Sequence, residues 1–444
     1  MKKKIKWFCV EPLTGGMYLG AEEAIGHKAE GIISFKDFAG FKYDKEGNAI
    51  DAANEQNLVE YLKQKNRLPD WYILNHDPFV ADTNYDPGFI KPDGFDFVSE
   101  KTSPNYENTD LVVAVPFCSG LSTSSIADAD HKAMRNCNMY WIANYILRTI
   151  SPKIYLFENA PTLMGSPGTE VRAYLEKLGN ELGYSVIYYK TNTKYHHNCQ
   201  NRPRTFIMFV KNRNGKTFIP NFNYEHDNMT IEDFFEEMQK NLTQENDPMI
   251  NECAQSEHNI NKIINVPIAY IEHLYGKNWR ELPECQGDII KQTVYNNKDE
   301  QQKMLAYIKD ICTEAEYNWY VKYFNHINEK IAMGKGYWAT MCSFFNTHVP
   351  PCMHKNMLVI AHYKENRLIN MREWFCLMGH PTDMNMIGKP TTYFRKIGQN
   401  VPVKTAKFMV SEITRILNNW DKEQSVDNDK TVAYFDNTHM KRIY

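Results

Sequence analysis

Four side chains that could do chemistry lie at the ends of apolar runs typical of buried strands. Cys118 follows the run 111–115, Glu158 closes a second run, and Arg202 and Arg204 stand just before a third. Because open α/β sheets bind ligands at the ends of their strands, we expect these groups to form one site. A thiol can act as a nucleophile, a carboxyl group can hold a proton, and a guanidinium group can stabilise an anion. Taken singly, each has an ordinary structural explanation, such as a buried cysteine or a surface arginine.

The composition is that of a globular protein of two or three domains, with 444 residues of which 43% are apolar and 24% charged. The basic opening precedes only a short apolar stretch, so we expect a first strand rather than a signal peptide, and no run suits a membrane span. The ten cysteines are scattered, which favours reduced thiols and a cytoplasmic location. Cys342, Cys352 and His354 come closest to a metal cluster, but their spacing fits no common zinc site, and we expect no metal. The net charge of −3 is not the basic balance typical of nucleic-acid binders, although a local basic patch would suffice.

Strand-like and helix-like patterns alternate in the first half of the chain, which predicts a doubly wound, mostly parallel α/β sheet. The expected strands are 4–10, 31–35, 71–74, 111–115, 153–157, 184–189 and 205–210. The expected helices between them are 17–26, 57–65, 131–150 and 169–182.

Beyond residue 211 the pattern changes and helices dominate. They are expected at 231–241, 267–275, 298–309 and 314–331. We therefore predict a catalytic domain over 1–211, an inserted, smaller, helix-rich domain over 212–366, and a segment over 367–444 that returns to the first domain. The polar last twenty or so residues are expected to form a loose tail.

Five motifs can be recognised along the chain. They are residues 117–122 around the cysteine, residues 158–160, the set Gln200, Arg202 and Arg204, the set Arg367, Arg372, Glu373, Pro381 and Asp383, and the closing segment 398–403. In this order, with a variable insert between the third and the fourth, they resemble the motifs of the cytosine-5 DNA methyltransferases. The resemblance covers most of the chain outside 212–366. It implies a Rossmann-like methyltransferase fold with 212–366 as a target-recognition domain that reads DNA.

The resemblance implies a DNA (cytosine-5-)-methyltransferase that acts on double-stranded DNA. The Cys118 thiolate would add to carbon-6 of a cytosine flipped out of the duplex, and a methyl group would pass from S-adenosylmethionine to carbon-5. Glu158 would hold a proton at N3, and Arg202 or Arg204 would bind O2 or a phosphate. One of these arginines would also lower the pKa of the thiol. The loop from Ser119 to about Asp130 would close over the base.

The residues that the resemblance assigns to the methyl donor depart from the family pattern. They are Glu11, Thr14, Gly15, Gly16, Ser34, Pro116, Asn400 and Val401. Leu13 stands where the family has a glycine, and a Cβ at a point of close approach blocks a ligand or moves it. Glu11 and Pro12 replace an aromatic and a small residue. Two alternatives therefore stay open, a cytosine-modifying enzyme with a different donor and a catalytically inactive DNA-binding relative.

Expectations about partners are less detailed. The resemblance allows a restriction-modification role beside a cognate restriction endonuclease, and we expect a monomer. Residues 334–338, a glycine-rich segment with Tyr337 and Trp338, are our prediction for a loop that contacts DNA. The target DNA sequence cannot be derived from the residues of the insert.

Overall fold

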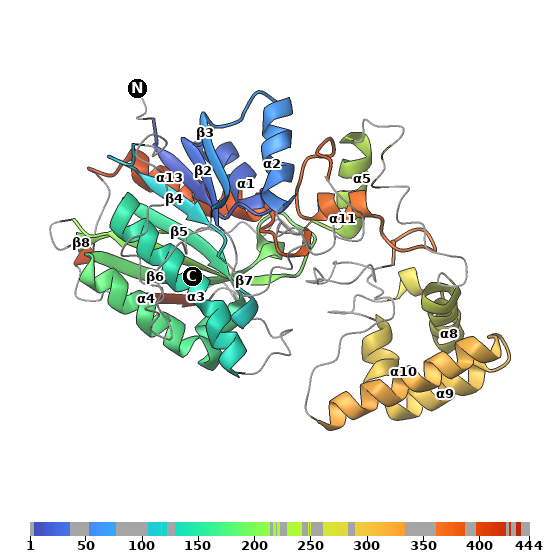
Figure 1. Ribbon diagram of the computed structural model, residues 1–444. Coiled ribbons are helices and arrows are strands. Elements are labelled where there is room, and N and C mark those ends of the chain that lie inside the picture. Colours follow the sequence, from blue (N-terminus) through green and yellow to red (C-terminus); the bar gives the residue numbers. More distant parts are fainter. Residues whose placement is uncertain are drawn as a thin grey trace, which may run out of the picture.

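The protein consists of a body built on one large sheet and a separate group of helices, as the computed structural model shows (Figure 1). The structure describes residues 4–35, 53–76, 105–116, 118–121, 129–213, 216–218, 220–222, 229–241, 247, 249, 261–282, 289–333, 361–386, 397–422, 426–427 and 432–436.

The large sheet has eight strands, of which seven were expected. They are β1 (Trp7–Val10), β2 (Gly31–Phe35), β3 (Trp71–His76), β4 (Leu111–Ala114), β5 (Ile154–Asn159), β6 (Tyr184–Asn192), β7 (Pro203–Lys211) and β10 (Val432–Asp436). Their order is β10-β6-β7-β5-β4-β1-β2-β3. β7 runs antiparallel to β5 and β6, whereas the other neighbouring pairs are parallel. A small second sheet joins β8 (Lys216–Thr217) and β9 (Val426–Asp427). The predicted doubly wound, mostly parallel fold is confirmed.

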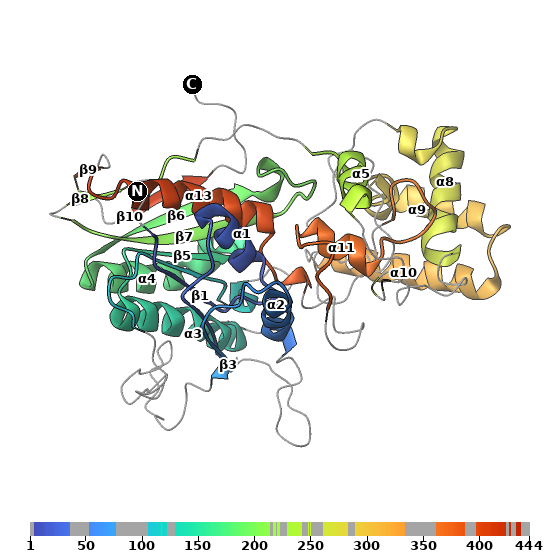
Figure 2. The same ribbon diagram turned by 90° about the horizontal axis from the view of Figure 1, so that it is seen from above.

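Helices cover both faces of the large sheet (Figure 2). One face carries α1 (Gly16–Ile25), α2 (Ala53–Gln64) and α13 (Val403–Asn418), and the other carries α3 (Ala129–Tyr145) and α4 (Thr169–Glu181). Each face has its own apolar cluster. In β1, Trp7 and Cys9 pack into the cluster with α1, α2 and α13, whereas Phe8 and Val10 pack into the cluster with α3 and α4. Side chains of a strand alternate between its faces, so a strand covered on both sides must be apolar throughout. This explains the continuous apolar runs of the sequence.

A third apolar cluster belongs to the separate group of helices. It joins α8 (Val266–Tyr275), α9 (Lys298–Ile308) and α10 (Glu314–Ala332). In Figure 2 these helices lie at some distance from the sheet, whereas α5 (Ile231–Asn241) and α11 (Met371–Leu377) lie closer to it. The buried side chains of α5 belong to the cluster on the α1 face of the sheet. The domain boundaries near residues 212 and 366 stay predictions.

The C-terminal segment returns to the sheet more fully than expected. α13 packs against α1, and β10 adds a parallel edge strand beside β6, with Val432 opposite Val186. The Tyr434 ring stacks on Tyr188, with centroids 4.9 Å apart. The prediction of a loose tail is therefore wrong for residues 432–436, because five residues in a polar context gave too short a strand signal. None of the described helices is both long and apolar enough to cross a membrane.

Candidate active site

The expected catalytic side chains come from three neighbouring strands. Cys118 lies just beyond β4, at the start of a turn in which the Leu121 N–H donates to its carbonyl over 3.0 Å. Glu158 is the second-last residue of β5, which pairs with β4 in parallel. Arg204 is the second residue of β7. Since β7 runs antiparallel to β5, its beginning lies at the edge where β4 and β5 end. The predicted convergence of these groups therefore follows from the strand directions.

A buried ion pair joins the carboxyl group and one arginine. The Arg204 Nε lies 2.6 Å from a Glu158 carboxylate oxygen, and the two side chains are 19% and 4% exposed. Burial raises the pKa of Glu158, and the charges of Arg204 and Arg202 offset only part of this rise. A carboxyl group with a raised pKa holds its proton more readily than an exposed one. Glu158 is thus suited to share a proton with a bound base.

The thiol of Cys118 responds to the same charges. Burial and, next, the charge of Glu158 raise its pKa, whereas Arg204 and Arg202 lower it. Both arginines lower the thiol pKa, as expected from the sequence, but burial and Glu158 outweigh them and the net shift is upward. A thiol with a raised pKa is protonated near neutral pH. A nucleophilic role for Cys118 would therefore require the thiol to lose its proton when a substrate binds.

The two arginines stand at alternate positions, which in a strand would place them on one face, but only Arg204 lies within β7. Arg202 precedes β7 and is buried, and its Nη2 donates to the carbonyls of Gly398 and Asn400 over 2.8 and 3.1 Å. Gln200 of the same motif is also buried, and its Nε2 donates to the Leu377 carbonyl. The last residue of the motif, Arg204, pairs with Glu158. The first two fasten the C-terminal segment to the sheet.

Residues 11–16, here called the donor loop, follow β1 in an uncommon backbone conformation. Glu11 and Leu13 have φ angles of 50° and 53°, and Gly15 has 103°. A left-handed conformation costs a residue with a Cβ roughly 1–2 kcal/mol. The Leu13 side chain is buried in the apolar cluster on the α1 face, so the loop holds this residue despite that cost. Ser34, also buried, lies near the end of β2 at the same sheet edge.

The donor loop is packed against the segment around Asn400 and Val401. The Gly16 N–H donates to Asn400 Oδ1 over 3.1 Å, and Asn400 Nδ2 donates to Thr14 Oγ1. A Cβ on Gly16 would lie 1.8 Å from the Val401 carbonyl oxygen. Gly16 is therefore required for contact with another part of the chain. His380 Nε2, which sequence reasoning missed, lies 2.5 Å from Asn400 Nδ2.

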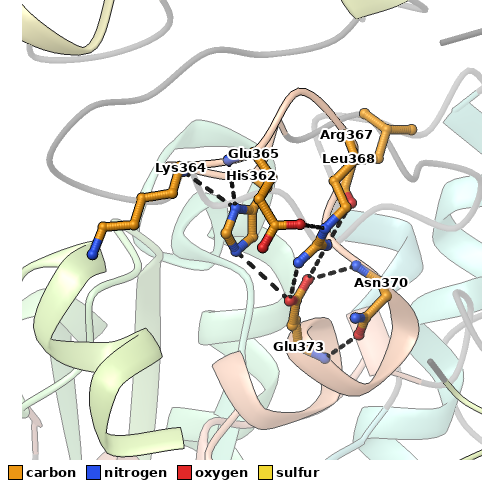
Figure 3. A network of polar contacts seen from close by, with 7 residues as sticks. All are labelled: His362, Lys364, Glu365, Arg367, Leu368, Asn370 and Glu373. Atoms are coloured by element: carbon orange, nitrogen blue, oxygen red, sulfur yellow. Dashed lines mark hydrogen bonds and ion pairs between the residues drawn. The ribbon is translucent and has the colours of Figure 1, made fainter. Parts of the chain in front are cut away.

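The start of α11 is held by a polar network around Glu373 (Figure 3). Arg367 donates to both Glu373 carboxylate oxygens over 2.8 and 2.7 Å, and the Asn370 N–H donates to one of them over 2.8 Å. The Asn370 side chain in turn accepts from the Glu373 N–H, which completes a capping box. Burial lowers the pKa of His362 to about 4, so its imidazole beside Glu373 is neutral near pH 7.

Other residues of this motif also make structural contacts. Arg372 is fully buried. Its Nη2 donates to Asp247 Oδ1 over 3.2 Å and to Asn385 Oδ1 over 2.7 Å. Asp383 pairs with Lys65, which directly follows α2, and this pairing lowers the pKa of the carboxyl group despite partial burial. The fourth motif thus holds α11 and its neighbours in place.

A cavity of about 370 Å³ lies beside the end of α11. Its walls come from α5, the end of α11 and the β6–β7 connection, and they include His197, Cys199, Phe234, Met238 and His380. Neither Cys118 nor Glu158 lines it. Phe117, most of the loop 119–130, residues 334–338, and Cys342, Cys352 and His354 lie outside the described residues.

Comparison with known proteins identifies the family. The profile of the C-5 cytosine-specific DNA methylases matches residues 83–415, more than half of the chain, and the chain belongs to this family. A structure of an E. coli prophage protein, described as a DNA modification methyltransferase, is 15% identical, with 93% of this chain and 99% of that chain aligned and a TM-score of 0.50. The structure of the S. pombe Dnmt2 methyltransferase is 14% identical, with 93% of this chain and 99% of that chain aligned and a TM-score of 0.42. Among curated proteins no sequence matches. At such identities the E. coli structure supports the Rossmann-like methyltransferase fold alone.

Proposed function

We propose that the protein is a DNA (cytosine-5-)-methyltransferase that uses S-adenosylmethionine. The observation that carries this proposal is the convergence of Cys118, Glu158 and Arg204 at one sheet edge in a C-5 cytosine-specific DNA methylase. A thiol, a carboxyl group with a raised pKa and a guanidinium group are what nucleophilic addition to a cytosine ring requires.

Cys118 supplies the nucleophile in this proposal. Its thiolate forms a bond to carbon-6 of the flipped-out cytosine, and the electron pair of the 5,6 double bond makes carbon-5 nucleophilic. Because the thiol of the free protein has a raised pKa, it must lose its proton as the base binds. Arg204 and Arg202 favour the thiolate, and their influence grows when the base excludes water from the site.

Glu158 and Arg204 stabilise the electron density that addition pushes onto the ring. Glu158 shares its proton with N3, which its raised pKa favours. Arg204, paired with Glu158 over 2.6 Å, binds the cytosine O2 or the neighbouring phosphate. Arg202 acts at a distance, through its charge and through the C-terminal segment that it holds.

The donor loop fits S-adenosylmethionine in spite of its unusual residues. Its backbone keeps left-handed conformations at Glu11 and Leu13, and the Leu13 side chain is buried in the core. Glu11, Thr14 and Ser34 add buried polar groups at the ends of β1 and β2, with Pro116 after β4. When bound, the donor supplies a methyl group on a positively charged sulfur. The carboxylate of Glu11 suits such a cationic ligand.

We further propose that residues 212–366 read double-stranded DNA, with α8, α9 and α10 as their structural core. A core of its own lets this part hold reading loops over the major groove while the sheet holds the base. The monomeric state and a restriction endonuclease partner stay predictions.

The test is mass spectrometry of nucleosides from the DNA of cells that express the chain. We expect 5-methylcytosine with the unchanged protein and none with Cys118→Ala. The matched control is Cys312→Ala, because Cys312 is another partly exposed thiol with a raised pKa, and it packs against the apolar cluster of α8, α9 and α10. This control should leave the modification unchanged.

Other outcomes would identify the alternatives. A Cys118-dependent cytosine product of another mass would exclude methylation and assign a different donor. No change in any base, together with no covalent complex on DNA that contains 5-fluorocytosine, would leave an inactive DNA-binding relative.

A further inference from the structure

The side chain of Asn400 uses its whole hydrogen-bonding capacity within the protein. Its Oδ1 accepts from the backbone N–H groups of Gly16 and Val401, each over 3.1 Å. Its Nδ2 donates to Thr14 Oγ1 and, over 2.5 Å, to His380 Nε2. A side-chain amide offers two lone pairs and two hydrogens, and all four are engaged here. Asn400 is also fully buried, so its amide has no group left for a ligand.

This pattern determines the tautomer of His380. Because Asn400 Oδ1 accepts from two backbone N–H groups, Nδ2 must face the histidine, and the unprotonated Nε2 must accept. His380 therefore carries its hydrogen on Nδ1. Burial, followed by the charge of Arg372, lowers the pKa of His380 to about 3, so the acceptor is present at neutral pH. The ring stacks on Phe375, with centroids 4.1 Å apart and planes inclined by 8°, which holds its orientation.

Three separate segments are joined through this amide. Arg202 fastens the Asn400 carbonyl from the sheet over 3.1 Å, and His380 fastens the Asn400 side chain from the end of α11. The third segment is the donor loop, bound through Thr14 and Gly16. The fit is close, because a Cβ on Gly16 would clash with the Val401 carbonyl. A change at His380 would thus be transmitted to the donor loop.

We infer that His380 is a positioning residue that sets the donor loop through Asn400. The inference rests on the proposed function, in which this loop binds S-adenosylmethionine. Loss of the Nε2 acceptor would leave a buried Asn400 N–H without its partner, and the amide would then shift or rotate away from Thr14 and Gly16. Asn400 is likewise a positioning residue, because its side chain binds Thr14 and Gly16 of the donor loop.

The test compares two stacked, buried histidines. His380→Phe removes the acceptor and keeps a ring that can stack on Phe375. His196→Phe is the matched control, because His196 is as buried as His380, has a pKa lowered to about 3 and stacks on Phe408 over 4.6 Å. His196 bonds Thr191 and Thr405 over 3.2 Å, and both partners lie outside the donor loop. His380→Gln, which restores an acceptor oxygen, is the second variant.

Two measurements on the full chain report the result. Hydrogen exchange of the Gly16 and Val401 amides, without donor, should become faster in His380→Phe and stay unchanged in His196→Phe. The dissociation constant for S-adenosylmethionine should rise about ten-fold in His380→Phe, the effect of one lost hydrogen bond, with kcat at saturating donor within about two-fold. His380→Gln should recover part of both effects.

The inference is overturned if His380→Phe exchanges and binds the donor as the unchanged protein does, or if His196→Phe shows the same losses. Failure of the proposed function would look different. The unchanged protein would then bind no S-adenosylmethionine, while hydrogen exchange at Gly16 and Val401 would still report whether His380 sets the loop.

Discussion

Cys118, Glu158 and Arg204 form the proposed base site, and residues 11–16 form the donor loop. Both lie at the same edge of one sheet, but they are maintained in different ways. At the base site, Glu158 and Arg204 are fixed by the strands that carry them and pair directly over 2.6 Å. At the donor loop, Leu13 holds a φ of 53°, and contacts from Asn400, more than 380 positions away in the chain, fasten Thr14 and Gly16. One site depends on reactive groups and the other on a backbone shape.

This difference between the two sites explains why the donor loop departs from the family motifs while the base site keeps their reactive groups. A group that reacts cannot be replaced by one with other chemistry, and the thiol, carboxyl group and guanidinium group of the family motifs are all present. A backbone conformation can be imposed by its surroundings, so a leucine can stand in a position that favours glycine. The departures of the donor loop are therefore compatible with an intact loop geometry.

The largest expected effect comes from the carboxyl group of the base site. Glu158→Gln keeps the size of the side chain but cannot transfer a proton to N3, and we expect kcat to fall about a thousand-fold, within the usual range for a general acid. Single-turnover methylation at saturating DNA and donor measures it. Glu22→Gln is the control, because it alters another buried carboxylate. Arg67 donates to the two oxygens of Glu22 over 3.2 and 2.6 Å, and neither residue belongs to the base site. A loss of less than five-fold in Glu158→Gln would remove the carboxyl group from the proposed chemistry.

Local patterns predicted much of the fold and of the base site. Continuous apolar runs predicted seven of the eight strands of the large sheet, and strand-end positions indicated the edge at which Cys118, Glu158 and Arg204 lie. The contacts of Arg202 and His380 were missed because each depends on a residue brought near only by folding. β10 was missed because five residues carry little periodicity.

The next effect tests how tightly the donor loop is held. In Gly16→Ala, the new Cβ would lie 1.8 Å from a backbone oxygen that cannot move aside alone, so we expect a loss of about 3 kcal/mol in unfolding free energy. Gly26→Ala, at the C-cap of the same helix, is the control, because Gly26 has a φ of 89° and open space around its Cβ position. It should lose about 1 kcal/mol, from backbone strain alone. Denaturant titration compares the two variants, and equal losses would mean that the loop is not tightly packed there.

The smallest effect isolates the strain at Leu13. Leu13→Gly and Leu13→Ala both remove the buried side chain, and both should be less stable than the unchanged protein because the loss of a buried leucine side chain, about 2–5 kcal/mol, exceeds the strain of about 1–2 kcal/mol. The informative quantity is the difference between them. At a φ of 53° glycine is unstrained and alanine is not, so Leu13→Gly should be the more stable by about 1 kcal/mol in denaturant titration. At an ordinary position the order is reversed, because glycine loses more entropy on folding. The reversed order at Leu13 would show that the loop does not hold this conformation. The contrast between a backbone conformation imposed on the donor loop and the reactive groups proposed for Cys118, Glu158 and Arg204 would then fail at Leu13.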